Sequence, residues 1–279
     1  MSRPEPLSDL KTRRATGQNG IFEGLDADKT VFGTYARTGA WGLDVVHFFT
    51  RQSAEHPGCL YIDAGANIGL TAVPVAGLET IAATLCIEAD PVNQALLRRN
   101  LDANRVAATV AACAVSDHDG QLCFERAPDN FGDHRIKGTG ESRMDEAARD
   151  TIKVAARPLD TIVDELGRDG PILLKSDIQG AEPLLFRGGG ETLSRTHAAL
   201  LEYWPYGMAR LGEDEQAFRQ SIAAQFSAGA LIWPHAPTDD PDWKALPDIF
   251  AEIDRVFSGG ETELHKVGCL NLAVRKQAP

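Results

Sequence analysis

The fold of this 279-residue chain is decided by residues 59–69, CLYIDAGANIG. The first four of these residues are apolar or aromatic, which predicts a strand buried on both faces, and the strand ends at the acidic Asp63. Gly65 and Gly69 then mark a turn that leads into an apolar run over residues 68–78. Glycines let a ligand approach the backbone, and the following helix offers unpaired N–H groups. A buried strand, a glycine-rich turn and a helix form the opening unit of a nucleotide-binding α/β fold.

The spacing of these glycines argues against two common nucleotide-binding motifs. Three residues separate Gly65 from Gly69, whereas a dinucleotide-binding turn requires Gly-x-Gly-x-x-Gly and a phosphate-binding loop requires Gly-Lys-Ser/Thr. Asp63 would repel a pyrophosphate, but it suits a cationic or hydroxyl-rich ligand. An ordinary strand-to-helix turn is the alternative for these residues taken alone.

A second strand also ends in carboxylates. Residues 84–91, TLCIEADP, predict this strand, and the apolar spacing over residues 91–104 predicts a helix after it. Glu88 follows Gly69 by nineteen residues and lies at the tip of the neighbouring strand. A carboxylate there can accept hydrogen bonds from both hydroxyls of a ribose. A loop carboxylate that faces solvent is the alternative.

Strands and helices alternate along the rest of the chain, which predicts a mainly parallel sheet covered by helices on both faces. Residues 106–115 are expected to form a third strand that ends at Ser116 and Asp117, and residues 120–125 an antiparallel partner. Further strands are expected at residues 151–156, 198–202, 230–233 and 269–274, and helices at 43–49, 159–166, 213–228 and 246–257. Pro74 should kink or shorten the helix that follows the glycine turn.

Two segments lack this alternation. Residues 1–40 mix charges with Gly and Pro, so we expect a loosely held arm ahead of a main domain over residues 41–279. Residues 39–41 are candidates to approach the ligand site. Residues 126–150 are polar and glycine-rich, and long loops in compact domains are frequently functional lids. We expect a mobile lid there, and a surface insertion remote from the site is the alternative.

Composition narrows the class of partner. The chain has 28 basic and 40 acidic residues, a net charge of −12, with 43% hydrophobic and 24% charged residues, as in ordinary globular proteins. Nucleic acids and anionic membranes both bind basic surfaces, so neither is expected as a partner. Residues 1–20 lack the apolar core of a secretory signal, and the 15 uncharged residues 64–78 are too few to span a bilayer, which takes ~20. The oligomeric state is left open.

The five cysteines are odd in number and show no Cys-x-x-Cys spacing. Most of them lie in apolar, strand-like runs, which favours small core residues over a disulfide or a metal site. Together with the missing signal, this predicts a cytoplasmic protein.

Residues 171–182, PILLKSDIQGAE, repeat the design of residues 59–69: an apolar strand, an acid at its carboxyl end, a glycine and a helix. Asp177 and Glu182 are therefore expected beside the first glycine turn, with Lys175 paired to one carboxylate and holding it ionised. The alternative is that both acids cap a helix and Lys175 neutralises them.

Four matches in chain order identify a family. They are residues 63–69 (DAGANIG), residues 88–91 (EADP) with Asn100, residues 114–117 (AVSD) with Gly120, and Leu159-Asp160 ahead of residues 175–182 (KSDIQGAE). Together they resemble the FkbM family of S-adenosylmethionine-dependent methyltransferases, over roughly residues 59–202. The resemblance implies a Rossmann-like, seven-stranded class I methyltransferase sheet, mostly parallel with one antiparallel strand. It also implies methyl transfer to a hydroxyl of a sugar or another small molecule.

The resemblance assigns a role to each matched position. Asp63, Gly65, Asn67 and Gly69 would line the methionine end of S-adenosylmethionine, Glu88 would hold its ribose, and Ser116 and Asp117 would lie where adenine is contacted. The chain departs from the family at Gln179, where an acidic residue is more usual, which weakens any mechanism that needs a carboxylate there.

Methyl transfer to a hydroxyl requires that a base remove the hydroxyl proton. Asp177 and Glu182, with Lys175 beside them, are the first candidates, and His134 in the polar loop is a second. A carboxylate cluster could instead bind a divalent ion that lowers the pKa of the acceptor hydroxyl. The sequence shows no metal-ligand spacing that decides between these alternatives. Two other classes stay open: a nicotinamide-dependent oxidoreductase, disfavoured by the glycine spacing and Asp63, and a methyltransferase-like domain that binds without turnover.

Overall fold

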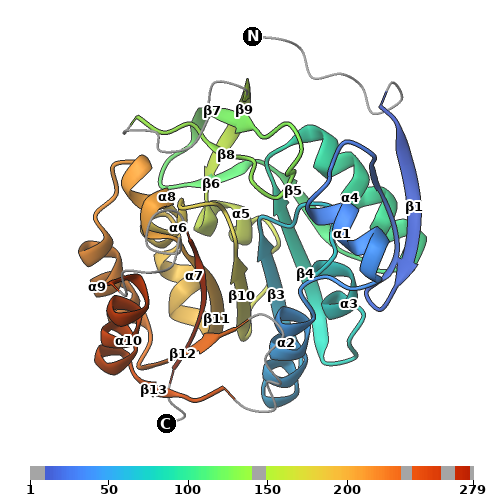
Figure 1. Ribbon diagram of the computed structural model, residues 1–279. Helices are drawn as coiled ribbons and strands as arrows, with labels where there is room; N and C mark the ends of the chain where they lie inside the picture. Colours follow the sequence, from blue (N-terminus) through green and yellow to red (C-terminus); the bar gives the residue numbers. More distant parts are fainter. Residues whose placement is uncertain (1–9, 140–148, 234–240, 259–267, 277–279) are drawn as a thin grey trace.

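The main sheet runs through the centre of the molecule (Figure 1). The computed structural model describes residues 10–139, 149–233, 241–258 and 268–276. The strand order of this sheet is β13-β12-β14-β11-β10-β3-β4-β5. The strands are β3 (Cys59–Ala64), β4 (Ile81–Glu88), β5 (Thr109–Ala112), β10 (Ile172–Ser176), β11 (Thr196–Tyr203), β12 (Ala228–Ile232), β13 (Lys244–Ala245) and β14 (Leu270–Arg275). Strands β11, β10, β3, β4 and β5 pair in parallel.

The α/β fold class is confirmed, with two differences in the sheet. The described residues form eight strands in the main sheet instead of seven, because the two-residue β13 pairs with the edge of β12. Strand β14 pairs antiparallel with both β11 and β12, and β13 pairs antiparallel with β12, so two strands run against the others instead of one. A strand of two residues carries no periodic pattern from which it could be predicted.

A second sheet of four strands, in the order β6-β9-β7-β8, lies beyond the carboxyl ends of β3 and β10 (Figure 1). Its strands are β6 (Ala114–Ser116), β7 (Gly120–Arg126), β8 (Arg135–Ile136) and β9 (Asp150–Pro158). The expected single strand over residues 106–115 is therefore wrong, because the chain leaves the main sheet after β5 and pairs with β9 through β6. Residues 120–125 are antiparallel as expected, with β9 and β8 as partners.

Helices cover both faces of the main sheet, and the alternation of side chains along each strand explains why. Tyr61 and Leu173 pack against α2 on one face, whereas Ile62 and Leu174 pack against helices from the later part of the chain on the other. The first face carries α1 (Val31–Thr38), α2 (Leu43–Glu55), α3 (Ala72–Ala76) and α4 (Pro91–Asn104). The second carries α5 (Leu159–Asp164), α6 (Glu182–Arg187), α7 (Gly190–Arg195), α8 (Pro205–Arg210), α9 (Glu215–Gln225) and α10 (Leu246–Ser258).

The described part of the N-terminal segment is not a loosely held arm. It forms the hairpin β1 (Thr12–Gly17) and β2 (Gly20–Leu25), followed by α1. Phe22, Phe32 and Tyr35 are each 0% exposed and pack in one cluster with the apolar residues of α4. The side chain of Asn100 on α4 also bonds to both the N–H and the carbonyl of Glu23. The aromatic residues of this N-terminal segment follow no regular period, so the sequence pattern did not predict their packing.

Pro74 shortens the helix after the glycine turn, as expected. The apolar run over residues 68–78 yields only the five-residue helix α3, which includes Pro74. Within the described part of the chain, no helix is both long enough and apolar enough to cross a bilayer.

Candidate functional site

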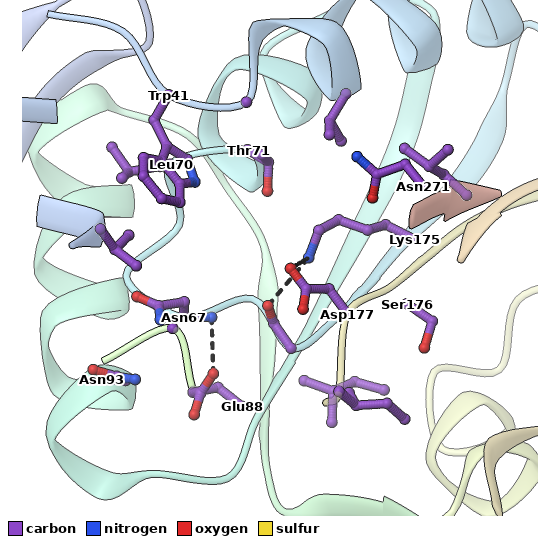
Figure 2. Close-up of a pocket in the computed structure, with 18 of the residues that line it drawn as sticks. Trp41, Asn67, Leu70, Thr71, Glu88, Asn93, Lys175, Ser176, Asp177 and Asn271 are labelled. Carbon is purple, nitrogen blue, oxygen red and sulfur yellow. Dashed lines mark hydrogen bonds and ion pairs between the residues drawn. The ribbon is translucent and has the colours of Figure 1, made fainter. Parts of the chain in front are cut away.

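A large cavity of about 1390 Å³ opens at the carboxyl ends of β3, β4 and β10. Open α/β folds bind ligands at this edge, and a site for one small molecule usually measures ~300–1,000 Å³. The cavity therefore has room for two molecules side by side. Figure 2 shows the central part, with Glu88 and Asn67 on one side and Lys175, Asp177 and Asn271 on the other.

The turn after β3 forms the floor of the cavity. Gly65 is required in this turn because the backbone at Asp177 approaches it closely. Gly65 has φ 78°, and a Cβ atom at this position would lie 1.9 Å from the carbonyl oxygen of Asp177. Asn67 also has a positive φ, 52°, and its side chain donates a hydrogen bond of 2.8 Å to the carbonyl of Phe131. Gly65 and Asn67 line the cavity as expected. Gly69, with φ 92°, packs against Leu97 instead and lies behind the wall.

Asp63 and Lys175 form a buried ion pair under this floor. The two atoms Nζ and Oδ1 are 2.9 Å apart, and Asp63 is 0% exposed. The other carboxylate oxygen accepts hydrogen bonds from the hydroxyls of Tyr61 and Thr71. Burial opposes the charge on Lys175, but Asp63 and Asp177 outweigh it and raise the pKa of Lys175 above its usual value. Lys175 lines the cavity as a cation, whereas Asp63, expected at the methionine end, lies behind it.

Glu88 lines the cavity at the end of β4, as expected. Its Oε2 accepts a hydrogen bond of 2.8 Å from the N–H of Asn67, and its Oε1 accepts one of 2.8 Å from the N–H of Asp90. Each oxygen keeps a second lone pair for a ligand. Burial raises the pKa of Glu88 to about 7.

The segment after β10 places Asp177 and Glu182, which the sequence did not distinguish, in different surroundings. Asp177 lines the cavity, its side chain is 45% exposed, and its Oδ2 lies 3.9 Å from Nζ of Lys175. Glu182 is fully buried and accepts hydrogen bonds from the N–H groups of Ile178 and Gly180. Burial raises the pKa of Glu182. Asp177 can therefore meet a ligand, whereas Glu182 holds the loop ahead of α6 and does not cap a helix.

Gln179, the departure from the family pattern, orients Asp177. Its Nε2 donates a hydrogen bond of 2.8 Å to Oδ1 of Asp177 and one of 3.2 Å to Oε1 of Glu202. Burial, and then the charge of Asp177, raise the pKa of Glu202 well above its usual value. An amide donates to both carboxylates, which an acidic residue in its ionised form would repel.

His134 lies in the cavity wall as a neutral ring. Burial lowers its pKa to about 4, and its Nδ1 accepts a hydrogen bond from the N–H of Ala127. The ring proton must then lie on Nε2, which makes His134 a donor. This arrangement does not suit the role of base that its position in the polar loop had indicated.

Residues 126–139, the described part of the expected lid, are packed more closely than their composition indicated. Arg126 pairs with the buried Asp90 at 3.0 Å, and Phe131 and Ile136 are both buried. Phe131, Gly132, His134 and Ile136 line the cavity, which places this segment at the site. Residues 140–148 lie outside the described residues. Ordering of the segment when ligands bind stays a prediction, which hydrogen exchange over residues 126–139 would test.

Apolar residues line the cavity between Glu88 and the second sheet, and we call this part of the lining the apolar slot. Its walls are Ala89, Ala114, Phe124, Ile136, Ile178 and Ala181. Ser116 and Asp117, expected at the adenine position, do not line the cavity. Ser116 is 0% exposed, and Asp117 pairs with Arg187 and His118 at the surface. A purine ring needs apolar faces, which the six walls of the slot provide.

The opposite wall comes from α2 and the loop before it, and sequence reasoning missed most of it. Asp44, His47 and Arg51 follow one another at helical spacing and line the cavity, as do Trp41 and Asn271. The expectation that residues 39–41 approach the site is met at Ala40 and Trp41. The spacing of polar residues along residues 44–51 was the available signal, because it marks one face of a helix.

No metal centre is evident in the part of the chain that the structure describes: no three His, Cys, Asp or Glu side chains gather there as a metal would require. The arrangement is one of a buried ion pair, a cavity-lining carboxylate on each of two strand ends, and an apolar slot.

Comparisons with known proteins are consistent with this site. The sequence model of the methyltransferase FkbM domain matches residues 63–224. The curated relative "2-O-methyltransferase NoeI" of Sinorhizobium fredii (strain NBRC 101917 / NGR234) is 32% identical over 164 residues, which are 53% of this chain and 65% of the relative. The match thus spans less than two thirds of that protein.

Among solved structures, the precorrin-6y C5,15-methyltransferase from Geobacter metallireducens GS-15 is similar with a TM-score of 0.43 and 9% identity, over 84% of this chain and 88% of that chain. M. jannaschii TYW2, solved in complex with AdoMet, is similar with a TM-score of 0.40 and 8% identity, over 95% and 86% of the two chains.

Proposed function

The chain belongs to the methyltransferase FkbM domain family, whose model covers more than half of it, and from this premise we propose that it transfers a methyl group from S-adenosylmethionine to a hydroxyl of a small molecule. The observation that carries the proposal is the single cavity that joins Glu88 and the apolar slot to Lys175, Asp177 and α2. One half suits a nucleoside, and the other half suits a polar acceptor.

The cofactor half of the cavity extends from the slot to the glycine turn. Glu88 would accept hydrogen bonds from the ribose hydroxyls, and the apolar walls around Ala114 and Phe124 would take the adenine. These walls replace Ser116 and Asp117 as the adenine contacts. The methionine end would extend along Gly65 and Asn67. Asp63 would not contact it, but would hold Lys175, which also donates to the carbonyl of Gly65.

S-adenosylmethionine supplies an activated methyl group on a sulfonium. The chain has two tasks beside it: to align the acceptor oxygen with the methyl carbon and to remove the hydroxyl proton. Asp177 is the base in this proposal, because its carboxylate lines the cavity and is held by Gln179 and Lys175. Asp177 would take the hydroxyl proton as the acceptor oxygen receives the methyl group that S-adenosylmethionine supplies.

The acceptor would occupy the half of the cavity that faces α2. Asp44, His47 and Arg51 offer hydrogen-bond donors and acceptors on one helical face. This mixture suits a sugar or a similar molecule with several hydroxyls, and the curated relative is named a 2-O-methyltransferase. The net charge of −12 disfavours RNA as the acceptor. The five free cysteines fit a reducing compartment, for which we propose the cytoplasm.

The test is transfer of a labelled methyl group from S-adenosylmethionine to a panel of methyl glycosides, with total RNA as a competing acceptor. We expect incorporation into a glycoside with wild-type protein and none with Asp177→Asn. Mass spectrometry of molecules that co-purify with the protein would extend the panel. Label in RNA would reassign the acceptor, and a folded protein that binds the cofactor but labels nothing would be a binding domain without turnover.

A further inference from the structure

The N-terminal hairpin meets the loop before α2 at a contact that admits no side chain. Gln18 donates its N–H to the carbonyl of Gly39 at 2.7 Å, and a Cβ atom on Gly17 would lie 2.2 Å from that same oxygen. The turn between β1 and β2 is therefore fixed against residues 39–42. All of these residues precede the family match over residues 63–224.

Asn19 connects this contact to the glycine turn through hydrogen bonds. Its Nδ2 donates hydrogen bonds to the carbonyls of Trp41, at 2.7 Å, and Leu70, at 2.8 Å. Its Oδ1 accepts one of 3.1 Å from the N–H of Trp41. Asn19 is 3% exposed, so its amide is buried and satisfied on both ends. One side chain thus joins three segments: the hairpin, the loop before α2 and the turn after β3.

The consequence is a fixed position for Trp41 at the cavity wall. Trp41, Leu70 and Thr71 all line the cavity, and a Cβ atom on Gly42 would lie 3.0 Å from the methyl of Thr71. Figure 2 shows Trp41 beside Leu70, with Asn67 between it and Glu88. A ligand whose ribose bonds to Glu88, and whose purine fills the apolar slot, extends its remaining end along Gly65 and Asn67 toward this wall.

We propose that Trp41, positioned by Asn19, covers the methionine end of the donor and extends the donor site beyond residues 63–224. This inference rests on the proposed function. An indole face packs against methylene groups and attracts a cation, and the methionine end carries both methylenes and positive charge. Asn19 is a positioning residue in this proposal, because it acts on the donor only through Trp41 and the turn.

The experiment compares three ligands that differ at one end. S-adenosylmethionine carries the methionine end and S-adenosylhomocysteine carries the same end without the methyl group, whereas adenosine lacks this end. In calorimetry, Trp41→Ala should weaken binding of the first two about ten-fold, the loss of ~1.4 kcal/mol, and leave adenosine within two-fold. Asn19→Ala should show the same pattern at three- to ten-fold. Trp233→Ala, at a tryptophan that is 40% exposed, is the matched control and should leave all three affinities unchanged.

The pattern across ligands separates this role from general damage to the fold. If Asn19→Ala unfolds, Trp41→Ala and the milder Trp41→Leu carry the test, since both keep the backbone bonds to Asn19. Equal affinities of wild type and Trp41→Ala for S-adenosylmethionine would overturn the inference while the proposed function stands. An equal loss for adenosine would overturn it too, because that loss would have no methionine specificity. A wild-type protein that binds none of the three would instead contradict the proposed function.

Discussion

Asp63 and Lys175 lie opposite each other in register on the parallel strands β3 and β10, and their side chains form a buried ion pair of 2.9 Å. Their side chains project to the face of the sheet that α2 covers, directly behind the glycine turn. Lys175 also donates to the carbonyl of Gly65 at 3.2 Å, so the pair fixes the floor of the cavity. The two residues are 112 positions apart, and the pair joins the two strand–turn–helix units that the sequence repeats.

Breaking this pair should cost much more than breaking one at the surface. Lys175→Met leaves a buried carboxylate without its partner, and we expect a loss of ~3–5 kcal/mol in the free energy of unfolding. The double variant Asp63→Asn/Lys175→Met should recover part of it. Arg157→Met, which breaks an exposed pair with Glu165, should cost much less, because solvent screens that pair. Urea unfolding of the four proteins measures this, and equal losses for the two single variants would contradict the account.

Glu88 should make cofactor binding depend on pH. Burial raises its pKa from 4.5 to about 7, so between these values the folded protein holds a proton that the unfolded chain has lost. The stability that this proton contributes is present below pH 4.5 and is lost as pH rises through 7. Ribose hydroxyls favour the carboxylate, so affinity for S-adenosylmethionine should rise between pH 5 and 7 and then level off.

Substitution at Glu88 should remove this pH dependence. Glu88→Ala should weaken binding ten- to a hundred-fold, since hydrogen bonds to a charged acceptor contribute ~1.5–3 kcal/mol. Glu88→Gln should bind more weakly than wild type and show a flat profile, whereas Glu182→Gln should keep the wild-type slope. Calorimetry on folded variants measures these affinities. An unchanged affinity of Glu88→Ala for S-adenosylmethionine would contradict the assignment of Glu88 to the ribose.

Asp177 and Glu182 should respond differently to loss of charge. Asp177→Asn should abolish methyl transfer and leave the affinity for S-adenosylmethionine within a few-fold, because the carboxylate faces the cavity. Glu182→Gln should instead lower stability by ~1–3 kcal/mol, since a buried acceptor of two N–H groups is altered. Single-turnover methylation and thermal unfolding separate the two effects. Retained activity in Asp177→Asn would end its assignment as the base.

Gly65→Ala should be far more damaging than a glycine substitution in open space. Its Cβ would lie 1.9 Å from the carbonyl of Asp177, and the residue has φ 78°. Both strand ends at the floor would have to move apart, so we expect loss of cofactor binding and lower stability. Gly190→Ala, with nothing within 4 Å of its Cβ, is the control and should be neutral. A normal Gly65→Ala protein would show that the floor is more adaptable than its geometry indicates.

The residues that define the central fold were predictable because their patterns are local. A buried strand, an acid and a glycine turn recur at residues 59–69 and 171–182, and both units lie side by side through β3 and β10. Glu88 was placed correctly at the cavity, since a strand end fixes the position of its last side chain.

The parts that were not predicted depend on contacts between distant segments. Ser116 lies in β6 and does not line the cavity, and the apolar run before it does not reveal that the chain changes sheets after β5. Asp177 and Glu182 looked equivalent in the sequence, but the backbone N–H groups of residues 178–180 hold the carboxylate of Glu182 inside the protein. Helix α2 forms the far wall although it lies before the first motif, so no spacing rule links it to that motif.

The most direct test of the account is a titration of the wild-type protein with S-adenosylmethionine and with NAD, followed by calorimetry. The two ligands share an adenosine, but they differ in the groups that would lie along the glycine turn. The account predicts saturable one-site binding of S-adenosylmethionine, at least ten-fold tighter than any binding of NAD and weakened by Glu88→Gln. Binding of NAD with equal or greater affinity, or no binding of S-adenosylmethionine by folded protein, would contradict it.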